Sequence, residues 1–288
     1  MGRVTSRYRV LRMVDGVATA RPDTLAAEEP LEIRVAGRPL SVTMRTPGDD
    51  FDLARGFLVS EGVVATGSDI SAIRYCAGAT ADGSNTYNVL DVVLAEGVPL
   101  PDPSVERNFY TTSSCGLCGK ASLEAVRTTS KWHVDRDPVR LTAATIATLP
   151  EKLRAAQRVF DRTGGLHAAG LFDANGDSWC VREDVGRHNA VDKVIGWGLG
   201  AGRLPLSGTT LMVSGRASFE LVQKAVMAGI PALAAVSAPS SLAVDLAREM
   251  GLTLIGFLRG SSMNVYSAGE RFDTVEAMQY GPAMLPTA

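Results

Sequence analysis

Residues 210–257 read TLMVSGRASFELVQKAVMAGIPALAAVSAPSSLAVDLAREMGLTLIGF, and this stretch decides the fold. Three short apolar runs alternate with two amphipathic runs. The apolar runs predict strands at 210–213, 232–236 and 252–257, and the amphipathic runs predict helices at 218–227 and 240–250. Short strand–helix–strand connections favour right-handed crossovers, so we expect a largely parallel sheet.

The residues upstream extend this pattern into a complete domain. A helix is predicted over 142–161, with Pro150 starting a second helical piece. Strands at 168–173 and 179–182 flank Ala174-Asn175-Gly176-Asp177, a strong hairpin turn, and a helix follows at about 187–196. The order helix, hairpin, helix, strand, helix, strand, helix, strand is the topology of the cytidine-deaminase-like fold, an analogy of architecture only. The prediction is a three-layer α/β domain.

The N-terminal third predicts a smaller α+β unit. Alternating residues at 31–35 and 40–44 indicate a β-hairpin, and an acidic first turn starts a helix from Asp49 to about Glu61. Strands are expected at 70–76 and 87–94, and Pro101 and Pro103 mark a boundary. We therefore expect a flexible arm at 1–25, a small α+β domain at 26–110, and a loop plus the large domain at 111–288.

Composition excludes several classes of protein. Of 288 residues, 45% are hydrophobic and 21% charged, which is ordinary for a globular protein and excludes a disordered chain. A net charge of −2 offers no polybasic surface for nucleic acid. The most apolar stretch, 225–244, is interrupted by Gly229, Pro231 and Pro239, so no membrane span is expected, and the N-terminus lacks a secretory signal. Four cysteines are too few for a disulfide framework, which predicts a reduced, cytoplasmic protein.

Two of these cysteines form the motif Cys115-Gly-Leu-Cys118. Ser114 is placed to cap a following helix, so amide dipoles and Lys120 would lower the pKa of a thiol there and populate the thiolate. The pair fits half a zinc site, a redox pair or a sulfur-carrying thiol. Zinc normally needs two more ligands, but the remaining two cysteines and the three histidines are scattered. We expect no metal site, and the flanking glycines favour a loop that another macromolecule can reach.

Two strand-to-helix junctions carry arginine beside glycine. One holds Gly186-Arg187-His188-Asn189, and the next holds Ser214-Gly215-Arg216-Ala217-Ser218. Free amide groups and two arginines at neighbouring strand ends favour an anion site, with Arg187 and Arg216 facing one crevice. In the deaminase-like fold these positions hold the zinc ligands, and because neither junction has a cysteine here, a zinc deaminase is excluded.

Two further segments are candidates for ligand contact. Gly164-Gly165-Leu166-His167 permits close backbone approach, although on this segment alone a turn with a packed histidine is the better interpretation. After the last strand, the chain continues through Leu258-Arg259-Gly260-Ser261-Ser262. Gly260 allows the backbone to approach a phosphate, Arg259 supplies a planar fork, and the two serines supply hydroxyl donors. A solvated turn with a surface arginine is the alternative.

Five motifs in order give the sequence a specific resemblance. They are SCGLCGK (114–120), TGGLHAA (163–169), REDVGRHNAVDK (182–193), SGRASFE (214–220) and GFLRG (256–260). Together they resemble the FdhD family of sulfur carriers required for formate dehydrogenase, over about residues 28–270. The resemblance implies a sulfurtransferase that accepts persulfide sulfur from a cysteine desulfurase. It also implies transfer to the molybdenum cofactor, bis(molybdopterin guanine dinucleotide), before that cofactor enters formate dehydrogenase.

The resemblance also assigns roles to residues. It implies that the cofactor is bound as cargo, with no tightly held catalytic cofactor, and that its nucleotide docks at Phe257, Leu258, Arg259, Gly260, Ser261 and Ser262. Cys115 is predicted to carry the persulfide and Cys118 to assist it, because Cys115 is nearer the open end of the loop. Among its partners, a second copy of the same chain, in a homodimer, is also considered. The alternatives are a thiol–disulfide oxidoreductase, which leaves the arginines unexplained, and a cofactor chaperone without sulfur transfer.

Overall fold

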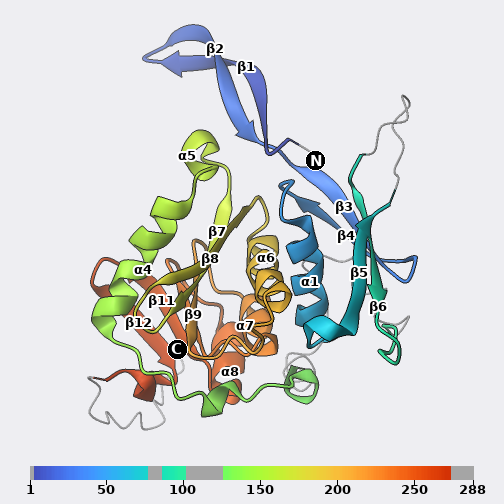
Figure 1. Ribbon diagram of the computed structural model, residues 1–288. Helices are drawn as coiled ribbons and strands as arrows, with labels where there is room; N and C mark the ends of the chain where they lie inside the picture. Colours follow the sequence, from blue (N-terminus) through green and yellow to red (C-terminus); the bar gives the residue numbers. More distant parts are fainter. Residues whose placement is uncertain (1–2, 77–85, 102–125, 274–288) are drawn as a thin grey trace, which may run out of the picture.

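The apolar runs of the fold-deciding stretch form the centre of a six-stranded sheet in the computed structural model, which describes residues 3–76, 86–101 and 126–273. The strand order is β12-β11-β10-β9-β7-β8 (Figure 1). The strands are β7 (His167–Asp173), β8 (Ser178–Asp184), β9 (Thr209–Val213), β10 (Ala232–Ala235), β11 (Thr253–Arg259) and β12 (Ser262–Ser267).

The sheet is mixed, and this corrects the expectation of a largely parallel one. β9, β10 and β11 are parallel, as predicted, but β7 runs antiparallel to both β8 and β9, and β12 runs antiparallel to β11. Crossover helices force parallel pairing only where they connect two strands, whereas the tight turns after β7 and β11 return the chain antiparallel. The predicted α/β class is confirmed, and the cytidine-deaminase-like analogy stays a prediction.

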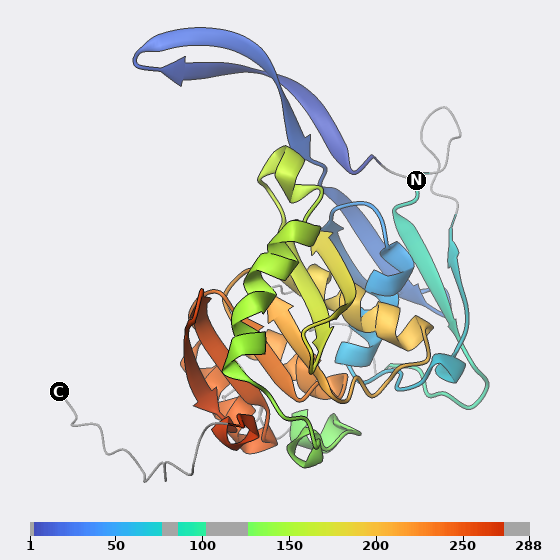
Figure 2. The same ribbon diagram turned by 60° about the vertical axis from the view of Figure 1, so that its left-hand side comes forward.

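Helices cover both faces of the sheet. α4 (Ala143–Ala156) lies on one face and shares a core with Phe172, Met212 and Ile255 (Figure 2). The other face packs on three helices and holds the alternate strand residues, such as Leu171, Leu211 and Leu254. These helices are α6 (Arg187–Gly200), α7 (Phe219–Met227) and α8 (Ser241–Met250), and the short helix α5 (Phe160–Thr163) follows α4. None of the helices in the described ranges is long and apolar enough to cross a membrane.

Pro150 lies inside α4, so the prediction that it starts a second helical piece is wrong. The proline removes one backbone hydrogen bond from the helix. Packing compensates, because Ile146, Leu149 and Leu153 bury one face of α4 against the sheet. The predicted helix therefore divides later, at Gln157, where α4 ends and the chain turns toward α5.

The N-terminal unit has a four-stranded sheet in the order β4-β3-β6-β5. Its strands are β3 (Glu29–Val35), β4 (Arg38–Arg45), β5 (Ile70–Tyr75) and β6 (Val89–Leu94), as predicted to within two residues. The helix α1 (Asp50–Ser60) packs on α6 of the large domain, where Gly56 and Gly196 let the two backbones meet. Short 3-10 turns complete the described chain at Gly67–Asp69, Val134–Arg136 and Gly269–Arg271.

Residues predicted to be a loose arm form a regular β-hairpin instead. β1 (Thr5–Val14) pairs with β2 (Val17–Ala26) antiparallel along the whole length, and the ribbon projects from the body (Figures 1 and 2). Its turn is Asp15-Gly16, both at positive φ, which is a strong two-residue hairpin signal. Neither face of the ribbon is buried, so apolar and polar residues do not alternate clearly along its strands. The arginines and Pro22 further obscure the strand pattern.

Candidate functional site

The predicted ligand segments lie along one edge of the large sheet. β8, β9, β10 and β11 all end there, and β7 begins there, because β7 is antiparallel to both neighbours. The start of β7 is held to the end of β9 by Ser214. Its hydroxyl accepts a hydrogen bond from the Ala168 N–H at 2.9 Å, and its own N–H donates to the Ala168 carbonyl at 3.0 Å. His167 is thereby positioned beside the Ser214-Gly215-Arg216 junction.

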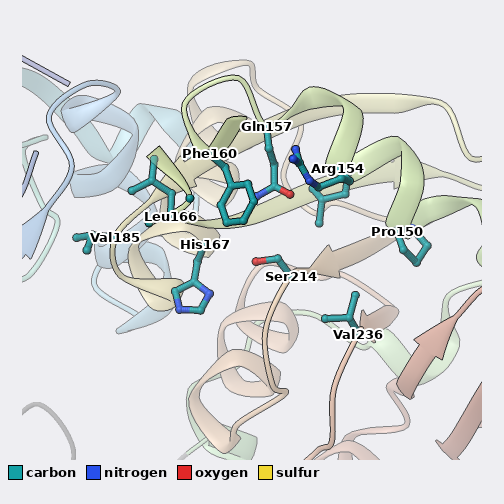
Figure 3. Close-up of a pocket in the computed structure, with 12 residues that line it drawn as sticks. Pro150, Arg154, Gln157, Phe160, Leu166, His167, Val185, Ser214 and Val236 are labelled. Atoms are coloured by element: carbon teal, nitrogen blue, oxygen red, sulfur yellow. The ribbon is translucent and has the colours of Figure 1, made fainter. Parts of the chain in front are cut away.

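A cavity of about 550 Å³ opens at this edge, below α4 and α5 (Figure 3). Most of its wall is apolar and includes Phe160 and Leu166. Four polar side chains line it: Arg154 on α4, which is paired with Asp161, Gln157 after α4, His167 on β7 and Ser214 after β9. Gln157 is only 4% exposed, and its side chain lines the cavity at the point where α4 ends.

Arg187 lies against this edge. A Cβ atom placed on Gly215 would be 3.5 Å from His167 Nδ1 and 4.0 Å from Arg187 Cδ, so these three residues adjoin. The Arg187 Nε is buried and has no hydrogen-bond partner within the described part of the chain. Since buried polar groups are normally satisfied, an unpaired guanidinium nitrogen is where an anion would bind. Neither α6 nor α7, the helices that begin at the two junctions, has a side-chain cap.

The two histidines at the edge are neutral at pH 7. Burial and then the charges of Lys224 and Arg187 lower the pKa of His188 to about 4. Burial and Arg187 also lower the pKa of His167. His188 Nε2 lies 3.4 Å from the Ser218 hydroxyl and 3.9 Å from Glu220 Oε2. The positive charge beside the cavity therefore comes from arginine, and the imidazoles act as neutral donors or acceptors.

The structure places the two predicted arginines differently. Arg187 is half-buried at the cavity edge, whereas Arg216 is exposed. Among the described residues, no hydrogen bond or ion pair joins them. Both belong to the carboxyl edge of the sheet, as the sequence predicted, but only Arg187 is shown against His167 and Gly215.

The predicted cofactor stretch forms the end of β11 and its turn into β12. Phe257 sits at φ 52° in a bulge, 44% exposed, and its N–H donates to the Ser237 carbonyl at 3.2 Å. Arg259, Gly260, Ser261 and Ser262 are exposed. Leu258 differs, because its side chain is fully buried in the core under α4. A ligand at this turn can therefore touch only the backbone of Leu258.

The β11 turn and the Arg187 junction lie apart along the same edge. The Arg187 side chain adjoins Gly215 at the end of β9, and β10 separates β9 from β11, so two strand spacings, roughly 10 Å, separate the end of β9 from the end of β11. One phosphate group cannot span that distance. An extended ligand with anionic groups along its length can contact both.

The predicted cysteine pair, Cys115 and Cys118, lies outside the described residues. Of the other two cysteines, Cys180 on β8 is buried, and burial raises the pKa of its thiol to about 12. Its thiolate is therefore not populated at neutral pH, so Cys180 cannot be the nucleophile. Within the residues that the structure places, no group of three or more His, Cys, Asp or Glu side chains could hold a metal ion.

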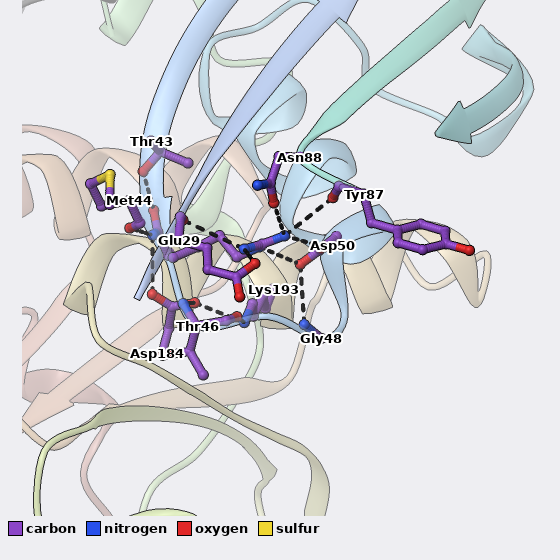
Figure 4. Close-up of polar contacts among 12 residues, drawn as sticks. Glu29, Thr43, Met44, Thr46, Gly48, Asp50, Tyr87, Asn88, Asp184 and Lys193 are labelled. Atoms are coloured by element: carbon purple, nitrogen blue, oxygen red, sulfur yellow. Dashed lines mark hydrogen bonds and ion pairs between the residues drawn. The ribbon is translucent and has the colours of Figure 1, made fainter. Parts of the chain in front are cut away.

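The rest of the motif at 182–193 holds the two units together. Lys193 Nζ lies 2.7 Å from the Asp184 carboxylate and donates to the Thr46 carbonyl at 2.9 Å (Figure 4). Asn189 donates to the Met44 carbonyl at 2.8 Å. Asp192 is buried and paired with Lys224 at 2.8 Å. The motif therefore contributes to the candidate site and also holds the large domain against the small N-terminal unit.

Gln157 is the site residue that sequence reasoning missed. It lies in a helical run with no motif around it, and its importance comes only from α4 ending over the cavity. His167 and Ser214 belonged to motifs noted in the sequence, but their contact depends on β7 pairing with β9, a long-range pairing that no local pattern indicates.

Fold and site together define an α/β protein with an arginine beside a cavity at the carboxyl edge of a mixed sheet. The chain matches the FdhD/NarQ family over residues 26–273 and belongs to that family. It is 70% identical over 272 residues to the sulfur carrier protein FdhD of Streptomyces avermitilis, covering 94% of this chain and 96% of the relative. The same-named protein of Mycobacterium tuberculosis is 59% identical over 274 residues, covering 94% and 99%.

A solved structure has the same fold. The crystal structure described as that of a formate dehydrogenase accessory protein from Desulfotalea psychrophila matches with a TM-score of 0.73 at 25% identity. The match covers 94% of this chain and all of the other. The predicted family is thus confirmed.

Proposed function

We propose that this protein is a cytoplasmic sulfur carrier that serves formate dehydrogenase. It accepts sulfur from a cysteine desulfurase and passes it to the molybdenum cofactor, bis(molybdopterin guanine dinucleotide), before that cofactor enters the dehydrogenase. The names of relatives that share 59–70% of their residues with this chain support the carrier role. The observation within the structure that carries the proposal is the buried, unpaired Arg187 Nε beside a cavity of about 550 Å³.

Sulfur acceptance requires one reactive thiolate. In the proposed step, the Cys115 thiolate attacks the terminal sulfur of the desulfurase persulfide, a new S–S bond forms, and the desulfurase cysteine leaves as a thiolate. The step is redox-neutral and needs no further reactant. Cys118 assists by holding the persulfide or resolving it. Cys180 takes no part, because its thiol is buried and protonated.

The cofactor is a substrate in this scheme, and the carboxyl edge suits its size and charge. Arg187 supplies an unpaired guanidinium N–H, and the exposed Arg259, Ser261 and Ser262 supply further donors at the β11 turn. The separation of roughly 10 Å between the end of β9, which Arg187 adjoins, and the end of β11 suits a dinucleotide, which carries several phosphates, better than a lone phosphate. The neutral His167 and His188 add hydrogen-bonding groups without competing for the negative charge.

Sulfur loading tests the proposal directly. The protein is incubated with a cysteine desulfurase and cysteine, separated from small molecules, and treated with dithiothreitol. We expect about one releasable sulfide per chain from the wild type and the Cys180→Ala control, and none from the Cys115→Ala/Cys118→Ala double variant. Absence of sulfide from the wild type, with both thiols intact, would favour the chaperone and contradict sulfur transfer.

The remaining alternative has its own signature. A thiol–disulfide oxidoreductase would reduce a disulfide such as that of insulin through Cys115 and Cys118 and would need no desulfurase. We expect no such turnover. Turnover without sulfide release would replace the carrier with the oxidoreductase.

A further inference from the structure

The short helix α5 bounds the cavity without belonging to a hydrophobic core (Figure 3). None of its four residues is buried, and Phe160, which lines the cavity wall, packs in neither of the two core clusters of the described chain. α4, by contrast, buries Ile146, Leu149 and Leu153 against the sheet. Elements with few buried apolar contacts open at a low cost in free energy. α5 is therefore the part of the cavity wall that moves most easily.

The chain can turn on both sides of α5. Before it, α4 ends at Gln157, whose backbone is not helical. After it, Gly164 has φ 66° and is followed by Gly165. A Cβ atom on Gly164 would meet no other atom within 4 Å, so this position is also open in space. Hinges of moving segments are a few residues of this kind at the ends of elements.

One carboxylate holds the start of α5 against the sheet. Glu183 on β8 accepts a hydrogen bond from the Val159 N–H at 2.9 Å and a second from the Phe160 N–H at 2.7 Å, each on a different oxygen. The first N–H groups of a helix have no partner within the helix, and the helix dipole favours a negative charge beside them. Because both bonds are charge-assisted, losing this carboxylate would free the end of α5 that carries Phe160.

The other side-chain contacts of α5 lie at the surface. Asp161 pairs with Arg154 at 2.5 Å, but both side chains are half-exposed. On the outer side of α5, Arg162 donates to Thr5 Oγ1 at 3.4 Å, at the base of the β1–β2 ribbon. Exposed ion pairs stabilise a fold little, since water screens them. The carboxylate on β8 is thus the main tether of α5.

We propose that α5 is a lid on the cavity and that Glu183 is the latch that keeps the lid closed. When its two hydrogen bonds break, α5 moves on hinges at Gln157 and at 164–165, and the Phe160 ring leaves the cavity wall. Glu183 is a positioning residue, because it acts through Phe160. The wall is mostly apolar and Arg187 adjoins it, so the lid admits an anion with an apolar, ring-shaped part. The inference rests on the proposed function only for the identity of the natural ligand.

Amide hydrogen exchange of the full chain tests the latch without a ligand. Glu183→Gln keeps the size of the side chain but loses its charge and one acceptor. We expect peptides covering 158–166 to exchange at least about 10-fold faster in this variant, while residues 146–153 keep the wild-type rate. The control Glu151→Gln, exposed on α4, makes the same change of charge and should alter neither segment. Unchanged exchange at 158–166, or equally faster exchange in both segments, would overturn the proposal.

Stopped-flow binding of anilinonaphthalene sulfonate, an aromatic anion that fluoresces in apolar surroundings, tests entry into the cavity. We expect Glu183→Gln to raise both the association and the dissociation rate constants at least about fivefold, because opening of the lid limits both. A wall that was merely damaged would release the probe faster but bind it no faster, and that result, or unchanged rates, would overturn the lid. Failure of sulfur loading with these rates raised would remove the carrier function and leave the lid in place.

Discussion

Replacing Gly196 by alanine should weaken the contact between the two structural units. Gly196 on α6 faces α1, and a Cβ atom there would lie 1.8 Å from the Asp52 carbonyl oxygen and 2.8 Å from the Gly56 nitrogen. A carbon–oxygen contact needs about 3.3 Å, so the helices must separate by roughly 1.5 Å. Both obstacles are backbone atoms, which cannot rotate away as a side chain can.

The magnitude follows from two opposing terms. Overpacking of a tight contact costs about 3 kcal/mol at the upper end of its usual range, which suits a backbone clash. Alanine returns up to about 1 kcal/mol through its higher helix propensity. The net expected loss in free energy of unfolding is about 2 kcal/mol. The same separation would also strain the buried pair Asp192–Lys224, which lies at this crossing.

Gly200→Ala, in the same helix, is the matched control. The nearest atoms to a Cβ at Gly200 all belong to the flexible Arg55 side chain, with the terminal Nη1 closest at 3.0 Å. We expect a change within about 0.5 kcal/mol. Urea unfolding followed by circular dichroism measures both variants. If Gly196→Ala proves as stable as Gly200→Ala, the helices are not held at backbone contact and the reasoning fails.

Four other outcomes are expected. Mass spectrometry after sulfur loading should find the added sulfur on Cys118→Ala but not on Cys115→Ala, and the reverse pattern would exchange their roles. Elemental analysis of protein purified without chelator should show no stoichiometric zinc; about one zinc per chain, lost with both cysteines, would contradict this. Calorimetry should show GDP bound more weakly by Arg259→Ala than by the wild type, by about 1.5–3 kcal/mol, and equal affinities would place the nucleotide elsewhere. Because the folded pKa of His188 is about 4, below its ordinary 6.5, the unfolded state binds this proton first as pH falls. Stability should therefore decline from pH 6.5 toward 4 less steeply in His188→Gln than in the wild type, and equal slopes would mean that His188 is not the titrating group.

Local patterns predicted most elements of this fold. The strand–helix alternation at 210–257 gave β9, α7, β10 and α8 to within about one residue at most ends, because each run buries a face with a clear period. The hairpin β1–β2 was missed for the opposite reason. Both of its faces are solvated, so no burial pattern was present, and only the Asp15-Gly16 turn indicated it.

The site was only partly predictable. Sequence predicted Arg187 and Arg216 at neighbouring strand ends; both follow carboxyl ends at the same edge, but β7 lies between β8 and β9. It could not show that Lys193 and Asp192 are buried, because each depends on a partner far along the chain, Thr46 or Lys224. It also could not show that Leu258 points into the core, since the bulge at Phe257 changes which side chains face outward.

The two units that the sequence separates do not form independent bodies in the structure. One hydrophobic core runs from Leu31 and Leu90 of the small sheet, through α1, to Val194 and Leu211 of the large domain. The close contact of α1 and α6 at Gly56 and Gly196 and the Asp184–Lys193 pair stabilise this same interface. A hinge motion at this interface would expose apolar core surface and two buried charges to water at the same time. The small unit is therefore held rigidly against α6. Entry and exit of a large substrate must then depend on segments that lie outside this shared core.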